Sequence, residues 1–174
     1  LAQKLSVAPE ALIFGNGSNE IIELLVRTFL SRGEHAVVAD QAFVIYRMIV
    51  QAAGGRCTVV PLRNYTHDLE AMAEAITPAT RLVFLANPNN PTGTIFFRSQ
   101  WREFLAAVPP HVVVVMDEAY AEFVEDPEYP DSLSDIGSDR LVVVLRTFSK
   151  IYGLAALRIG YAVGRPELIE LVNR

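Results

Sequence analysis

The 174-residue sequence has a single cysteine, Cys57, and no long hydrophobic run. One cysteine excludes an internal disulfide and a thiolate cluster for a metal, and it makes a reducing compartment, the cytoplasm, the expected location. The longest apolar stretches, such as residues 111–116, are far shorter than the roughly 20 residues that a membrane-spanning helix needs. The net charge is −5 and no basic run offers a stripe for nucleic-acid phosphates. These absences argue against disulfide-stabilised, membrane-spanning and nucleic-acid-binding proteins.

The composition is that of a folded domain. Hydrophobic residues make up 51% of the chain, charged residues 20%, and the mean hydropathy is +0.27. This apolar content excludes a disordered tail and suffices for the core of one large domain, or of part of a larger one. The sequence starts at Leu1 and stops inside an apparent helix, Pro166–Arg174. We therefore expect a fragment of a longer protein.

Short β-branched runs alternate with longer amphipathic runs along the chain. We expect strands at Ala36–Ala39, Arg56–Val60, Arg81–Ala86, Val112–Asp117, Leu141–Arg146 and Ile159–Val163. We expect helices at Ser18–Leu30, Phe43–Ala53, Asp68–Ile76, Ser99–Ala107 and Pro166–Val172. This alternation predicts an α/β fold, with a mostly parallel mixed sheet and helices on both faces. Ligands of such sheets lie beyond the carboxyl ends of the strands, so the residues that follow each strand are candidates for a site.

Two of these junctions are turns of unusual composition. Gly15–Glu20 is a glycine-rich turn that opens an apolar helix, and backbone N–H groups at such a helix start favour an anion such as phosphate. Ser18 or Asn19 could instead simply cap the helix. The turn is a poor dinucleotide-binding motif because Glu20 occupies the place of the third glycine. Asn87–Gly93 holds two prolines and a glycine; its asparagine amides could face a ligand, or it could be an ordinary tight loop.

Two further junctions carry charged side chains. Asp117 ends a strand that we expect to be buried on both faces, so its carboxylate needs a positive or strongly hydrogen-bonding partner. Tyr120 would lie near Asp117 if a helical turn follows, although a capping aspartate beside a half-buried tyrosine would give the same pattern. Lys150 ends the segment Arg146–Lys150, where an apolar setting would favour a nucleophile or a base. Arg158 adds a planar guanidinium suited to phosphate.

Taken together, these segments match a known family. Asn90–Gly93, Asp117–Tyr120 and Ser149–Lys150 with Arg158 resemble the motifs of the pyridoxal-phosphate-dependent aminotransferases of fold type I. Within that group, the stretches GNGSNEIIE, ANPNNPTG, DEAY and RTFSKIYGLAALRIGY look most like those of the histidinol-phosphate aminotransferases. The resemblance covers essentially the whole chain. It implies that residues 1–174 are the cofactor-binding large domain, without the N-terminal arm and the C-terminal small domain of the family.

The resemblance also assigns roles to the matching residues. Lys150 would carry pyridoxal 5′-phosphate covalently and then act as the base of the reaction, and Asp117 would keep the pyridine nitrogen protonated. Asn90 and Tyr120 would hydrogen-bond the 3′ oxygen of the ring, which would make Tyr120 a third catalytic residue beside Lys150 and Asp117. Phe43 matches the aromatic residue that stacks on the ring, where other members carry tyrosine. The phosphate would be bound by Gly17, Ser18, Asn19, Thr147, Ser149 and Arg158.

The resemblance implies transamination of L-histidinol phosphate with 2-oxoglutarate, giving imidazole-acetol phosphate and L-glutamate in histidine biosynthesis. Alternatives with the same fold and cofactor are an aminotransferase for aromatic or other amino acids, or a decarboxylase of a phosphorylated amino acid. A cofactor-binding or dimerisation module without catalysis is a third interpretation. Family members are homodimers and bind the substrate carboxylate through residues outside this chain, so we expect the isolated chain to be inactive.

The three histidines, His35, His67 and His111, are scattered along the chain and lack the spacing of metal ligands. We expect them to be structural or surface residues, and we predict no metal site.

Overall fold

The computed structural model describes all 174 residues and contains one seven-stranded sheet with the strand order β1-β7-β6-β5-β4-β2-β3. The strands are β1 (Leu12–Asn16), β2 (His35–Ala39), β3 (Arg56–Val60), β4 (Thr80–Ala86), β5 (Val113–Asp117), β6 (Leu141–Thr147) and β7 (Ile159–Gly164). The pairs β3–β2, β2–β4, β4–β5 and β5–β6 are parallel, whereas β7 runs antiparallel to both β6 and β1. The sheet is therefore mixed and mostly parallel, as predicted.

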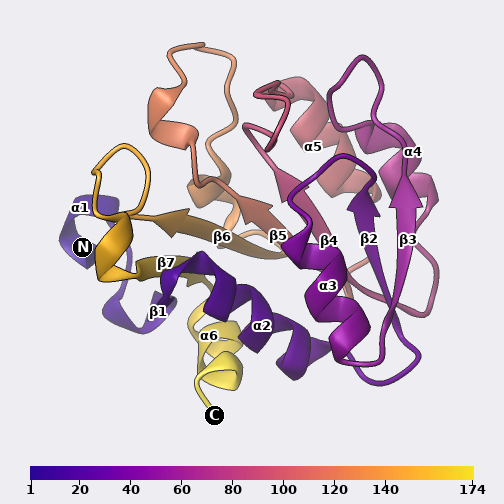
Figure 1. The fold of residues 1–174 in the computed structure, drawn as a ribbon, viewed down its shortest axis with the longest axis horizontal. Coiled ribbons are helices and arrows are strands. Elements are labelled where there is room, and N and C mark those ends of the chain that lie inside the picture. The colour runs from indigo at the N-terminus through magenta and orange to yellow at the C-terminus, as the bar shows by residue number, and fades with distance from the viewer.

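The helices alternate with the strands along the chain (Figure 1). They are α1 (Ala2–Leu5), α2 (Gly17–Phe29), α3 (Ile45–Ala52), α4 (Leu69–Glu74), α5 (Arg98–Ala107) and α6 (Pro166–Val172). Each predicted helix is present, with ends that differ by at most two residues. The side chain of Asp68 caps α4 by accepting a hydrogen bond from the backbone N–H of Ala71 (3.2 Å). No helix has both the length and the apolar character that a membrane span requires.

Strand β1 is absent from the predicted elements because its pattern is weak. Its five residues, LIFGN, end in the glycine-rich turn, and the strand is largely half-buried or exposed. Pairing with β7 nevertheless forms it, since Gly15 lies opposite Gly160 and Asn16 lies opposite Ile159. The glycine-rich segment is therefore the end of a strand followed directly by α2.

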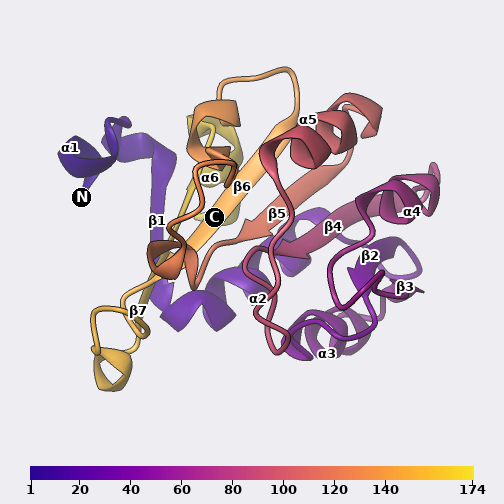
Figure 2. The same cartoon turned by 90° about the horizontal axis from the view of Figure 1, so that it is seen from above.

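Helices cover both faces of the sheet, and each face has its own apolar core. Figure 2 shows α4 and α5 on one side of the strands and α2 and α3 on the other. Trp101 and Phe104 of α5 and Met72 of α4 pack on the first face, while Ile22 of α2 and Tyr46 of α3 pack on the second. The central strands β4, β5 and β6 are buried on both faces, which explains their continuous apolar sequences.

The carboxyl ends of the central strands meet at one edge of the sheet. Ala86 of β4 lies opposite Asp117 of β5, and Thr147 ends the neighbouring β6. Because β7 is antiparallel, its first residues lie at this same edge, with Gly160 opposite Thr147. The start of α2 is brought to the same place by β1. The fold thus collects at one edge the segments in which the sequence predicts site residues.

Substituting Gly160→Ala tests the close approach of β7 to α2. A Cβ at Gly160 would overlap the backbone of Gly17 and Ser18, which cannot rotate away as a side chain can. We expect a loss of about 2 kcal/mol in the free energy of unfolding. The matched control is Gly137→Ala, whose Cβ would have open space and should change stability by less than about 0.5 kcal/mol. Equal stability of the two variants in denaturant titrations would contradict this packing.

Candidate active site

A cavity of about 110 Å³ opens at the carboxyl edge of the sheet. Every residue that the sequence analysis named as catalytic or cofactor-binding lines it: Gly17, Ser18, Asn19, Phe43, Asn90, Asp117, Tyr120, Thr147, Ser149, Lys150 and Arg158. These residues come from segments that are as much as 141 positions apart, between Gly17 and Arg158. Tyr46, Ala86, Pro88 and Ala119 complete the lining. The structure therefore assembles the predicted residues into a single site.

Asp117 is the buried charge of this cavity, with 6% of its surface exposed. Its Oδ2 accepts a hydrogen bond from the hydroxyl of Tyr46 (2.6 Å), and its Oδ1 accepts one from the backbone N–H of Ala119 (3.0 Å). Burial raises the pKa of the Asp117 carboxyl, while these two hydrogen bonds and the positive charge of Lys150 oppose the rise. The carboxylate is thus fixed in orientation and needs a further positive partner.

Tyr46 is a site residue that the sequence analysis did not identify. Its ring stacks on Phe84 (centroids 4.9 Å apart, 9° between planes) and meets the edge of Phe43 (5.6 Å, 85°). Burial, together with the negative charge of Asp117, raises the pKa of the hydroxyl well above its usual value, so Tyr46 remains a hydrogen-bond donor. The signal available in the sequence was the need of Asp117 for a partner, but only the fold shows which residue meets it.

Lys150 lies in a more open position than expected. The sequence suggested an apolar setting, yet its side chain is exposed, with Nζ 4.9 Å from the centre of the Tyr120 ring. The reason is that Lys150 follows β6 in a turn, and the residues after it, from Ile151 to Ile159, are all exposed. Tyr120 itself lies in a turn after β5, at the start of a short 3₁₀ helix, Ala121–Phe123. The amine is therefore accessible from the cavity.

The start of α2 and Arg158 form a cradle for an anion. The N–H of Gly17 donates to the carbonyl oxygen of Arg158 (2.8 Å), so it is already occupied. The N–H groups of Ser18 and Asn19 belong to the first helical turn, where they have no partner within the helix. A Cβ at Gly17 would run into the Arg158 guanidinium, which lies directly against the helix start. Two backbone donors and a positive charge thus border the same cavity.

Hydroxyl groups complete this cradle. The Oγ1 of Thr147 accepts a hydrogen bond from the N–H of Ser149 (3.1 Å) and lies 3.4 Å from the carbonyl oxygen of Ile159. Thr147 therefore also braces the turn that leads to Lys150. Ser149 lines the cavity beside it.

The turn Asn87–Gly93 is held by its own buried amides. The side chain of Asn87 exchanges two hydrogen bonds with the backbone of Phe96 (3.0 and 3.1 Å), and the backbone N–H of Asn87 donates to the carbonyl oxygen of Asp117 (3.0 Å). Asn87 and Asn89 are buried, whereas Asn90 is half-buried and lines the cavity. The segment is therefore a turn braced by two buried asparagines, and a role of the Asn90 amide in ligand binding stays a prediction.

Glu118 and Arg146 form an ion pair that the sequence did not predict, on the side of Asp117 away from the cavity. Glu118, 1% exposed, receives two hydrogen bonds from the Arg146 guanidinium (2.9 and 2.7 Å) and one from the hydroxyl of Ser132. Because successive residues of an extended chain face opposite ways, Asp117 faces the cavity while Glu118 faces Arg146. The ion pair ties the segment after β5 to β6.

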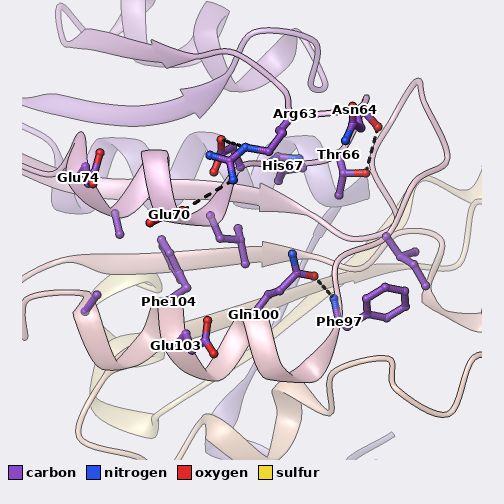
Figure 3. Close-up of a pocket in the computed structure, with 15 residues that line it drawn as sticks. Arg63, Asn64, Thr66, His67, Glu70, Glu74, Phe97, Gln100, Glu103 and Phe104 are labelled. Atoms are coloured by element: carbon purple, nitrogen blue, oxygen red, sulfur yellow. Dashed lines mark hydrogen bonds and ion pairs between the residues drawn. The ribbon is translucent and has the colours of Figure 1, made fainter.

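Figure 3 shows another, larger cavity of about 620 Å³ between α4 and α5. None of the predicted site residues lines it. Arg63, the positively charged residue of its wall, is paired with Asp68 (2.8 Å) and lies 3.7 Å from Glu70. His67 also belongs to this wall and is buried, with 3% exposed. We expected each histidine to be a structural or a surface residue, and His67 is a structural one.

Comparison with known proteins places these motifs in a family. The sequence model of the family described as "Aminotransferase class I and II" matches residues 1–174. The histidinol-phosphate aminotransferase of Moorella thermoacetica is 54% identical over 175 residues, which are 100% of this chain and 45% of that protein. Histidinol-phosphate aminotransferase 2 of Hydrogenovibrio crunogenus is 49% identical over 174 residues, 100% of this chain and 47% of that protein.

Solved structures give a similar result. A crystal structure of histidinol-phosphate aminotransferase from Sinorhizobium meliloti in complex with pyridoxal-5′-phosphate superposes with a TM-score of 0.92 at 32% sequence identity. The match covers 99% of this chain and 47% of that one. The chain therefore spans about half the length of the relatives it matches.

The buried imidazole of His67 predicts a pH-dependent stability. Burial lowers its pKa from 6.5 to about 4, against the opposing effect of its hydrogen bond with Asn89. The unfolded chain therefore takes up this proton first, and stability should fall by up to about 3 kcal/mol as the pH drops from about 6.5 to about 4. The His67→Gln variant cannot take up the proton, so denaturant titrations should show its stability falling less over this range. Parallel curves for the two proteins would contradict the prediction.

Proposed function

We propose that this chain, which belongs to the class I and II aminotransferase family, binds pyridoxal 5′-phosphate in this cavity and transfers an amino group. The substrates that we propose are L-histidinol phosphate and 2-oxoglutarate, which would give imidazole-acetol phosphate and L-glutamate in histidine biosynthesis. The observation that carries the proposal is the convergence of an accessible lysine, a buried carboxylate and an anion cradle on one cavity. The choice of amino donor is supported by the names of relatives that are about 50% identical.

The residues present fit this cofactor by their chemistry. The backbone N–H groups of Ser18 and Asn19 and the guanidinium of Arg158 suit a phosphate dianion, and the absence of a Cβ at Gly17 lets that guanidinium lie against the helix start. The buried carboxylate of Asp117 suits a protonated pyridine nitrogen, which is the positive partner that it lacks. The amine of Lys150 suits the aldehyde. Each functional group of pyridoxal 5′-phosphate thus has a complementary group here.

When bound, pyridoxal 5′-phosphate supplies an electron-withdrawing ring that accommodates the electron pair left on the substrate carbon. The part of the protein is to hold and to move protons. Asp117, oriented by Tyr46 and Ala119, would accept the hydrogen bond of the ring nitrogen and keep its proton in place. The amine of Lys150, accessible beside Tyr120, takes and returns the proton at the substrate carbon. Asn90 and the hydroxyl of Tyr120 would hydrogen-bond the ring oxygen, and Phe43 would pack on the ring.

Residues 1–174 would be the cofactor-binding large domain of a homodimer in the cytoplasm. The apolar side chains beside Lys150 support an assembly in which this surface is covered, because Ile151 is 44% exposed and Leu157 is 60% exposed. The single cysteine, which is free, is compatible with a reducing compartment.

Borohydride reduction of the protein mixed with pyridoxal 5′-phosphate tests the proposal. We expect an absorbance band in the near-visible range and, after reduction, a stable label on the peptide that contains Lys150. The Lys150→Ala variant should show neither. As a matched control, Lys4→Ala removes the other lysine of the chain, whose Nζ lies over Tyr152, and should keep the band and the label. A label distributed over both lysines in well-folded protein would contradict the proposed site.

A turnover assay should distinguish cofactor binding from complete amino-group transfer. Because the chain covers 45–47% of its relatives, we expect it to take the label yet to transfer amino groups poorly from L-histidinol phosphate. Robust turnover by the 174-residue chain would show that these residues suffice for substrate binding, contrary to the proposed domain role.

A further inference from the structure

His67 connects the wall of the larger cavity to the proposed cofactor site. It precedes α4, and its ring meets the edge of Phe96 (centroids 6.2 Å apart, 76°). Its Nε2 lies 3.1 Å from Oδ1 of Asn89, whereas Nδ1 is buried without any hydrogen-bond partner. A buried polar atom without a partner destabilises the fold. The hydrogen bonding of the His67 ring therefore depends on Nε2 alone.

Asn89 uses its side chain to join three segments. Its Nδ2 donates to the carbonyl oxygen of Gln41 (3.0 Å) and to the hydroxyl of Thr92 (2.8 Å), so its Oδ1 is free to accept. The backbone nitrogen of Ala86 also lies 3.4 Å from Nε2, but only a proton on Nε2 gives Oδ1 of Asn89 a donor, so we assign His67 as the donor and Nδ1 as the unpartnered lone pair. The backbone N–H of Asn89 also donates to the carbonyl oxygen of Thr94 (2.9 Å). Every donor of Asn89 is occupied.

The two neighbours of Asn89 in sequence line the proposed cofactor cavity. Pro88 and Asn90 both border this cavity. The side chain of Asn89, between them, does not line the cavity and bonds to His67 instead. Gln41, bonded to the same amide, lies two residues before Phe43, which borders the cavity from another segment. The Asn89 amide therefore sets the spacing between two walls of the cavity.

We infer that His67 is a positioning residue for the cofactor site: by donating to Asn89 it fixes the turn that carries Asn90 and, through Gln41, the segment that carries Phe43. This inference rests on the proposed function, because the consequence is tighter binding of pyridoxal 5′-phosphate. His67 does not line the cavity itself, although its Nε2 lies 3.4 Å from the backbone nitrogen of Ala86, which does. The interaction that carries the proposed effect is its hydrogen bond to Asn89, which an amide side chain in the same place can replace.

The test compares His67→Leu with His67→Gln. His67→Leu leaves the buried Oδ1 of Asn89 without a donor, and we expect the dissociation constant of pyridoxal 5′-phosphate, measured by absorbance titration, to rise about tenfold. His67→Gln restores an N–H donor and should bind the cofactor within about twofold of the unsubstituted protein. In an Asn89→Ala background, His67→Leu should weaken binding no further, because the shared interaction is already gone.

Met72→Ala controls for a loss of stability alone. Met72 of α4 is fully buried in the same apolar cluster as Phe96 and does not line the cofactor cavity, so its truncation should lower the melting temperature without changing cofactor affinity. The inference would be overturned if Met72→Ala weakened cofactor binding as much as His67→Leu does. It would also be overturned if His67→Leu left cofactor affinity unchanged. A His67→Gln variant as weak as His67→Leu would overturn it too. Failure to label Lys150 in the unsubstituted protein would instead overturn the proposed function, and this inference with it.

Discussion

The buried carboxylate of Asp117 is the constraint around which the rest of the site is arranged. It ends the central strand β5, is 6% exposed, and has only two hydrogen-bond donors, Tyr46 and the N–H of Ala119. Burying such a charge costs free energy unless a positive or donating group offsets it. Tyr46 meets part of this requirement, and a protonated ring nitrogen would meet the rest. Because Tyr46 packs on Phe84 in the core, the core fixes the hydroxyl that orients the Asp117 carboxylate.

The sheet topology explains how groups so distant in sequence meet. Parallel β4, β5 and β6 end at the same edge, and antiparallel β7 starts there, so Asp117, Thr147 and Gly160 become neighbours. The absence of a side chain at Gly160 then allows the start of α2 to approach with its N–H groups. The walls of the cavity are fixed from behind by polar contacts, Glu118 with Arg146 on one side and Asn89 with His67 on another. Strand ends and the turns that follow them thus position the side chains of the site.

Much of this arrangement could be predicted from the sequence because it depends on local patterns. Continuous apolar runs identified the central strands, and the residues after them proved to line one cavity. The partners of those residues could not be predicted, since pairing between segments far apart depends on the fold: Tyr46 contacts Asp117 across 71 positions. Strand β1 has too little apolar pattern of its own and is formed by its neighbour β7. The exposure of Lys150 follows from the turn after β6.

The ionisation of Asp117 gives the most direct test of the account. Carbon-13 NMR of its γ-carboxyl, assigned with the Asp117→Asn variant, would follow the titration without and with pyridoxal 5′-phosphate. We predict a pKa of the Asp117 carboxyl above 3.8 in the protein alone, raised by burial, and a clearly lower pKa once a positively charged ring nitrogen lies beside the carboxylate. An identical titration in both states would contradict the claim that this carboxylate is buried in order to hold the cofactor.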